Sequence, residues 1–249
     1  MVSIKNLFRM IQIRMIRFLS QIWSKSFQFQ QYDRILILSP HPDDEIIGCA
    51  GLIQKLLKHK KEVYVLMVTG GEAAWSASMI DSDELIAKRI ELMFSAAEIL
   101  KMSADNYICL KWSDKKLNET VNNQEKHYEL IRVINSIKPS AILIPHPFET
   151  SKDHQALNKT LSNSLKISDS KYKILYYWVH SLRPFREFNL RWKKSFIVHL
   201  DKEEYQRKRQ ALYVYTESLT PFGKPYVGEL YKSLLFSMKW DKELFFEAD

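Results

Sequence analysis

A histidine and three acids stand within five residues of one another in the segment SPHPDDE, residues 39–45. The apolar run RILILS (34–39) predicts a buried strand that ends here, and helical spacing resumes directly after the cluster. A helix N-terminus tolerates clustered acids through its dipole, but this does not explain His41 or the two prolines that stiffen the loop. His41 and Asp44, three residues apart, can converge on a divalent cation, which leaves Asp43 to face a metal-bound water. The segment therefore predicts half of a metal site.

A second apolar strand ends in a similar cluster. The run SAILIPH (140–146) leads into PFETSKDH, in which Asp153 and His154 stand at the start of a helix. The carboxyl ends of parallel strands meet at one edge of a sheet, so both clusters can reach the same cation. A catalytic zinc takes three protein ligands and keeps a fourth position for water. We expect His154 to be the third ligand, with His146 as its competitor.

Strands and helices alternate along the chain after residue 33. Short apolar runs predict strands at 34–39, 62–69, 106–112, 140–146, 173–181 and 195–200. Helical spacing predicts helices at 45–60, 82–102, 119–138, 152–167 and 201–219. This alternation predicts an α/β fold, a three-layer α/β/α sandwich around a mostly parallel, Rossmann-like sheet. A nucleotide site of the P-loop or Rossmann type is not expected, because no glycine-rich fingerprint follows the first strand.

The positive charge is concentrated at the N-terminus. The chain has a net charge of +8, yet residues 1–32 contain five basic residues and no acid, which leaves the remainder close to balanced. We therefore divide the chain into a basic arm (1–32) and one domain (33–249), and we expect no nucleic-acid partner. Cys49 and Cys109 lie in apolar stretches and do not suggest a disulfide framework. This favours a reducing, cytoplasmic location.

The basic arm predicts an amphipathic helix that precedes the sandwich. Charges interrupt its apolar runs, so it resembles neither a spanning helix of about 20 apolar residues nor a secretory signal. Two interpretations stay open: residues 1–27 contact an anionic membrane peripherally, at its inner face, or the helix packs on the domain or in an oligomer. Large apolar residues recur at helical spacing throughout the arm: Leu7, Phe8, Ile11, Met15, Phe18, Leu19, Ile22 and Trp23.

Several stretches of the domain together resemble one enzyme family. PHPDDE (40–45) contains the complete HPDDE motif of the PIG-L/LmbE-like zinc-dependent N-acetylglucosamine de-N-acetylases. The resemblance extends over residues 33–249 and includes four further segments: VTGGE (68–72), KRIELMFSAAEIL (88–100), ILYYWV (174–179) and KRQALYVYTESL (208–219). It implies one Zn²⁺ held by His41, Asp44 and His154, with Asp43 as general base.

The second motif of the family is altered in this chain. The family's H-x-D-H motif here reads Ser151-Lys152-Asp153-His154, so Ser151 replaces a histidine commonly assigned to transition-state stabilisation or proton donation. Asp153 joins Asp43 among the candidate catalytic residues, and His146 or His180 could supply the missing proton. Substrate contacts are expected from Ser151 and from Lys88 or Arg89, because Lys88 stands where the family's helix usually has an arginine and Arg89 is beside it.

The implied reaction is hydrolysis of an acetamide. Zinc would activate water and polarise the carbonyl, and Asp43 would accept the proton of the water. The resemblance implies a hydrolase that removes the acetyl group from an N-acetylated sugar or glycoconjugate, whether free, lipid-linked or nucleotide-linked. Two alternatives stay open: a zinc hydrolase of another N-acyl amide, and a catalytically impaired family member that acts as a membrane-surface binding protein.

Overall fold

The two predicted clusters lie at the carboxyl ends of five neighbouring parallel strands. In the computed structural model, which describes residues 4–75, 79–168, 171–179, 182–183, 185–228 and 232–248, they are β2 (Arg34–Ser39), β3 (Glu62–Thr69), β4 (Tyr107–Trp112), β5 (Ala141–Pro145) and β6 (Lys173–Tyr177). Their order across the sheet is β4-β3-β2-β5-β6. The chain first runs outward from β2 through β3 to β4, then returns to the other side of β2. This reversal creates a topological switch point between β2 and β5, where ligands bind in open α/β sheets.

The sheet continues beyond β6 with three more strands. They are β8 (Lys242–Glu247), β7 (Ser195–His199) and β1 (Lys25–Ser26). β8 runs antiparallel to both β6 and β7, and β1 is parallel to β7. The predicted α/β fold with a mostly parallel sheet is confirmed, but β8 was missed at the sequence level. Its segment KELFFE is short and carries charges at both ends, so its pattern resembles that of a solvated chain end.

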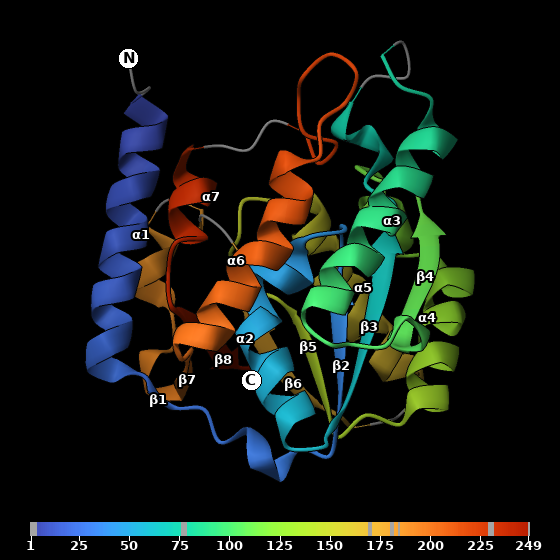
Figure 1. Ribbon diagram of the computed structural model, residues 1–249. Coiled ribbons are helices and arrows are strands. Elements are labelled where there is room, and N and C mark those ends of the chain that lie inside the picture. The colour runs from blue at the N-terminus through green and yellow to red at the C-terminus, as the bar shows by residue number, and fades with distance from the viewer. Residues whose placement is uncertain are drawn as a thin grey trace.

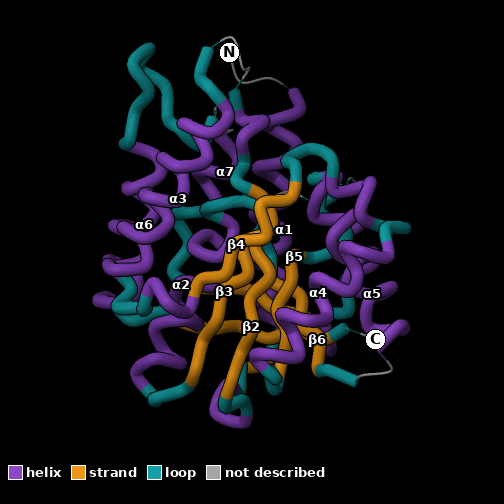
Figure 2. Tube along the Cα trace, turned by 90° about the vertical axis from the view of Figure 1, so that its right-hand side faces the viewer, coloured by secondary structure: helices purple, strands orange, loops and turns teal. Residues whose placement is uncertain are grey.

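Helices cover both faces of the sheet, as Figures 1 and 2 show. Alternate residues of β2 divide between two cores: Ile35 and Ile37 pack beneath α2, α3 and α6, whereas Leu36 and Leu38 pack against α4 and α5. The α-helices are α1 (Ile4–Trp23), α2 (Asp44–Lys58), α3 (Ser82–Ile99), α4 (Gln124–Ile137), α5 (Lys152–Ser168), α6 (Lys202–Glu217) and α7 (Lys232–Ser237). Short 3₁₀ helices are η1 (Phe29–Gln31), η2 (Glu72–Ala74), η3 (Ala104–Asn106), η4 (Leu117–Thr120), η5 (Arg186–Asn189) and η6 (Trp192–Lys194).

Two predicted elements are shorter in the structure than expected. The helix predicted at 119–138 is divided into η4 and α4 because the Asn123 side chain accepts a hydrogen bond from Lys126 N and caps α4 there. The strand predicted at 173–181 ends at Tyr177. Beyond it, Trp178 N still donates to Leu244 O, but the ladder does not continue.

The predicted N-terminal helix is present and lies against the domain. Its Ile13 and Ile16 are fully buried, and α1 contacts α7, β7 and η6. β1 then joins the edge of the sheet, so the described part of the arm is packed onto the domain; the boundary at residue 33 stays a prediction. None of the helices in the described ranges combines the length and apolar character that crossing a membrane requires.

A buried ion pair lies against the middle of α2, the helix that begins with Asp44. Lys208 Nζ is 2.6 Å from Glu243 Oε1, and the two side chains are only 3% and 1% exposed. Lys208 also donates to Ile47 O, while Glu243 accepts from Gly51 N and Leu52 N. Ile47 O and Gly51 N are the i, i+4 partners of a regular α-helix. The pair therefore ties α6 and β8 to the backbone of α2 itself.

Replacement of Lys208 by methionine should lower the free energy of unfolding by about 3–5 kcal/mol, because it leaves the buried Glu243 carboxylate without its counter-charge. Lys55→Met is the matched control. The Lys55–Glu204 pair also joins α2 to α6, but its lysine side chain is 21% exposed, so the expected loss is about 1 kcal/mol or less. Urea unfolding measures both variants. Equal losses in the two variants would show that the buried Lys208–Glu243 pair stabilises the fold no more than the Lys55–Glu204 pair does.

Candidate metal centre

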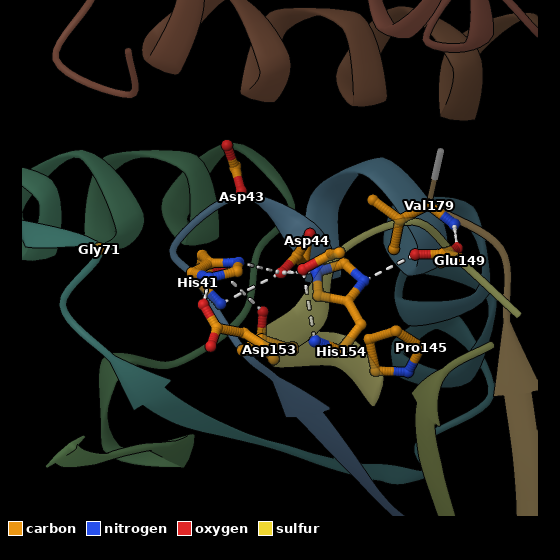
Figure 3. Close-up of polar contacts among 12 residues, drawn as sticks. His41, Asp43, Asp44, Gly71, Pro145, Glu149, Asp153, His154 and Val179 are labelled. Atoms are coloured by element: carbon orange, nitrogen blue, oxygen red, sulfur yellow. Dashed lines mark hydrogen bonds and ion pairs between the residues drawn. The ribbon is translucent and has the colours of Figure 1, made fainter. Parts of the chain in front are cut away.

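The loops that follow β2 and β5 converge at the switch point (Figure 3). Asp44 Oδ2 lies 3.1 Å from His41 Nδ1 and 3.2 Å from His154 Nε2. The three candidate ligand atoms all lie within 4.8 Å of one another. Two imidazole nitrogens and one carboxylate oxygen thus surround a single point, as the spacing of the two sequence clusters predicted for a three-ligand site.

Each of the two imidazoles is oriented by carboxylates behind it. His154 Nδ1 is 2.6 Å from Glu149 Oε2, and the other oxygen of Glu149 accepts from Val179 N at 2.6 Å. His41 Nε2 lies 3.3 Å from Asp114 Oδ1 and 3.3 Å from Asp153 Oδ2. Histidines that bind metals in proteins almost always have such a partner on the second ring nitrogen, because it fixes the tautomer and raises the basicity of the ligand.

A second group, formed by His41, Asp114 and Asp153, also has the composition of a metal site. Its carboxylates already accept backbone hydrogen bonds, however: Asp153 from Lys115 N at 3.1 Å, and Asp114 from Ala73 N at 3.0 Å. Such bonds do not by themselves exclude a cation, because Asp44 Oδ2 also accepts from His41 N at 3.1 Å. The two groups differ in composition: this one contains a single imidazole, whereas the His41–Asp44–His154 group contains two. Two imidazoles and one carboxylate are ligands that suit zinc.

The electrostatics of the centre favour a bound cation. Burial opposes the charge on Asp44, but His154 and His41 hold the pKa of Asp44 well below its usual range. Burial likewise opposes protonation of His154, yet Asp44 and Glu149 raise the pKa of His154 to about 9. Buried carboxylates surround the two imidazoles, so a dication would replace protons as the source of positive charge at this point.

Asp43 lies on the same loop but outside the ligand cluster. Its backbone φ is +131°, which residues other than glycine rarely adopt. In Figure 3 its carboxylate points away from His41 and Asp153, and none of the drawn contacts involves it. Burial and the neighbouring Asp44 raise the pKa of Asp43 to about 7. Such a strained and perturbed carboxylate is typical of a functional position.

The loop that carries Asp43 is held in place by Arg89 of α3. The Arg89 guanidinium is buried and donates to Pro42 O at 3.0 Å and Gly71 O at 2.6 Å. A Cβ atom at Gly71 would lie 1.9 Å from Arg89 Nη1, so only glycine fits beside this cation. Lys88 instead pairs with Glu91 in a solvent-facing contact. Of the two basic residues predicted to contact substrate, the structure places Arg89 behind the site and Lys88 away from it.

The residues predicted to act around the second motif have different surroundings. Ser151 Oγ accepts from His154 N at 3.3 Å, at the start of α5. His146 is 6% exposed and lies among the rings of Phe148, Tyr176 and Phe246. Burial lowers the pKa of His146 to about 3. His146 is thus not brought into the ligand cluster, and His180 lies outside the described residues.

Two acids of the site, Asp114 and Glu149, were not predicted from the sequence. Asp114 follows β4 by two residues, and Glu149 lies between the two histidines of the second cluster. Both therefore stand just beyond the carboxyl end of a strand. Their position after a strand is the one signal that the sequence offers, and it becomes decisive only with their low exposure in the structure.

The fold and this centre define a Rossmann-like α/β protein with a metal-binding cluster at the switch point of its sheet. The family model described as "PIG-L: GlcNAc-PI de-N-acetylase" matches residues 36–165, and the chain belongs to this family. The matched segment runs from β2 into α5 and contains all three candidate ligands. The predicted family resemblance is confirmed.

Individual relatives support the same placement. Over 130 residues, or 51% of this chain, it is 31% identical to diacetylchitobiose deacetylase of Thermococcus kodakarensis, of which this match covers 47%. The solved N,N'-diacetylchitobiose deacetylase of Pyrococcus horikoshii superimposes with a TM-score of 0.58 at 20% identity, covering 89% of this chain and 82% of that one.

The fold occurs with more than one activity. GalB, the 4-carboxy-2-hydroxymuconate hydratase of Pseudomonas putida KT2440, superimposes with a TM-score of 0.58 at 13% identity, covering 87% of this chain and 96% of that one. The fold alone therefore does not decide the reaction, which depends on the residues of the site.

Proposed function

We propose that this chain is a zinc-dependent hydrolase that removes the acetyl group from an N-acetylated amino sugar. The observation that carries this proposal is the convergence of His41, Asp44 and His154, each imidazole backed by a carboxylate, while the Asp43 carboxylate next to Asp44 lies outside the cluster. Membership of the PIG-L family supports the choice of an acetamide as the bond that is broken. Diacetylchitobiose deacetylase, the relative at 31% identity, supports an amino sugar as the substrate.

One zinc ion is the proposed cofactor. His41, Asp44 and His154 would hold it, and three protein ligands leave a position for water or substrate. When bound, zinc would polarise the amide carbonyl and lower the pKa of a coordinated water. The carboxylates Glu149, Asp114 and Asp153 would keep the two imidazoles in the required tautomer. This assigns Asp153 to positioning His41.

Asp43 is the proposed general base. It lies next to the ligand Asp44 on a loop that Arg89 and Glu45 hold rigid; Glu45 accepts from Ser39 Oγ at 2.8 Å and from Asp43 N at 3.3 Å. A fixed carboxylate beside the metal can accept the proton of water and return it to the leaving amine. This route needs no histidine at position 151, where Ser151 instead caps α5.

The proposed enzyme should release acetate from N,N'-diacetylchitobiose only when zinc is bound. Treatment with a chelator should abolish acetate release, and added zinc should restore it, because chelation removes the ion and leaves its ligand residues chemically unchanged. Purified protein with full zinc occupancy and no acetate release from this or from simple N-acetylhexosamine conjugates would contradict the amino-sugar proposal. Acetate release from other N-acyl amides would then favour the alternative hydrolase.

The proposed location is the cytoplasm, and the proposed partners are an amino-sugar substrate, free or linked to a lipid or nucleotide, and an anionic membrane contacted by residues 1–27. Low exposure of Cys49, with both cysteines unpaired, fits a reducing compartment. Nucleic acid is not among the proposed partners, because most of the basic excess lies in the arm and the remainder of the chain is close to balanced.

A further inference from the structure

Helix α1 has an apolar face on each of its two sides. Its inner side buries Ile13 and Ile16 against the domain. Its outer side exposes a second row at helical spacing, in which Phe18 and Ile22 are 64% and 57% exposed. The large apolar side chains exposed along the helix are Leu7, Phe8, Ile11, Phe18, Ile22 and Trp23. The packing of α1 on the domain therefore does not account for the sequence of its outer side.

This exposed row continues onto the loop that follows β6. Phe8 meets Phe185 edge to face, with 6.1 Å between ring centroids. Phe185 and Phe188 are 67% and 65% exposed. The segment is anchored beneath by Gln12 Nε2, which donates to Glu187 Oε2 at 2.6 Å. Large apolar patches on a monomer mark interaction sites, and this one joins two segments that are 175 residues apart.

The exposed charges on the two segments that carry this surface, 4–32 and 185–194, are of one sign. Arg14 and Lys25 are exposed on the N-terminal segment, and Lys193 is exposed on η6, which contacts α1. Residues 4–32 contain no acid. The single acid of 185–194, Glu187, is buried beneath the surface. The apolar row is therefore flanked by cations.

We propose that the outer side of α1, together with Phe185 and Phe188, docks on the surface of an anionic phospholipid bilayer. The row lies on the outside of a single helix that stands at the edge of the molecule in Figure 1, and 20 residues give it a length of about 30 Å. A helix of this kind lies in the interface with its apolar side in the acyl boundary and its cations at anionic headgroups.

A second copy of the chain fits this surface less well. A two-fold contact would place the cations of one copy, such as Arg14, close to those of the other. The bilayer instead provides opposite charge and an apolar layer together. Membrane docking does not depend on the deacetylase activity, so either proposal can fail without the other.

Co-sedimentation of the full chain with vesicles tests this proposal. We expect binding to vesicles of phosphatidylcholine with phosphatidylserine and little binding to phosphatidylcholine alone. Phe18→Ser/Ile22→Ser should weaken binding at least about tenfold. The free energy of burying even one of these apolar side chains in the acyl region corresponds to about tenfold or more in affinity. Gln21→Ser, an exposed polar change on the same helix, should bind as the wild type does. Lys25→Glu/Lys193→Glu should weaken binding through charge alone, with the apolar row intact.

Circular dichroism and zinc content show whether each variant is folded. Equal binding to neutral and anionic vesicles, or unchanged binding by both double variants, would overturn the proposal. So would a wild-type dimer in sedimentation velocity that Phe18→Ser/Ile22→Ser converts to a monomer, without vesicle binding by either protein. That result would assign the surface to a second copy.

Discussion

Replacement of Asp43 by asparagine is expected to lower kcat for acetate release by about 10²–10⁴-fold, the usual contribution of a positioned general base. Asparagine has the same shape and is tolerated at positive φ better than most residues. The loop can therefore keep its conformation, with Arg89 still bonded to Pro42 O. Zinc content should stay that of the wild type, because Asp43 is not among the three converging ligands.

The comparison requires acetate release and zinc to be measured on the same preparation. Asp83→Asn, an exposed acid in the first turn of α3, is the matched control and should retain full activity. Wild-type turnover in Asp43→Asn would rule out the role of base. Loss of zinc together with activity would instead place Asp43 in the ligand set.

The ligand cluster could be predicted from the sequence because its residues lie in the loops and helix starts that come after two strands. In a parallel sheet the carboxyl ends of all strands lie at the same edge. His41 and His154 could therefore meet as long as β2 and β5 were neighbours. The proline-containing loops after these strands keep the ligands near the strand ends, so little long-range information is needed to place them. The same logic predicted the fold class, since alternating strands and helices leave few topologies open.

The residues around the ligands could not be predicted in the same way. Asp114 reaches His41 from β4, on the far side of β3, through a loop whose conformation the sequence does not specify. Glu149 is recognisable only when its zero exposure and its bond to His154 are known. His146 resembled a site residue because it stands at a strand end, yet its ring packs among aromatic side chains. Proximity in sequence to a motif therefore did not determine which way a side chain points.

Replacement of His154 by alanine is expected to remove zinc from the purified protein. It deletes one of three ligand atoms, and it leaves the buried Glu149 carboxylate without the ring nitrogen 2.6 Å away. The loss in zinc affinity should exceed the roughly 10–100-fold typical of changes behind a ligand. Metal analysis and competition with a chelator measure occupancy and affinity, and His59→Ala, which removes an exposed imidazole at the end of α2, should leave both unchanged.

Glu149→Gln tests the carboxylate that orients His154 while leaving the His154 ligand itself in place. The amide keeps the shape of the carboxylate and can still accept from Val179 N, but it no longer holds the charge that orients His154 Nδ1. We therefore expect a zinc affinity between those of the wild type and His154→Ala, lower than wild type by about 10–100-fold. If His154→Ala retained wild-type zinc, the cation would have to lie on the other side of His41, with Asp114 and Asp153, and the three-ligand assignment would be wrong.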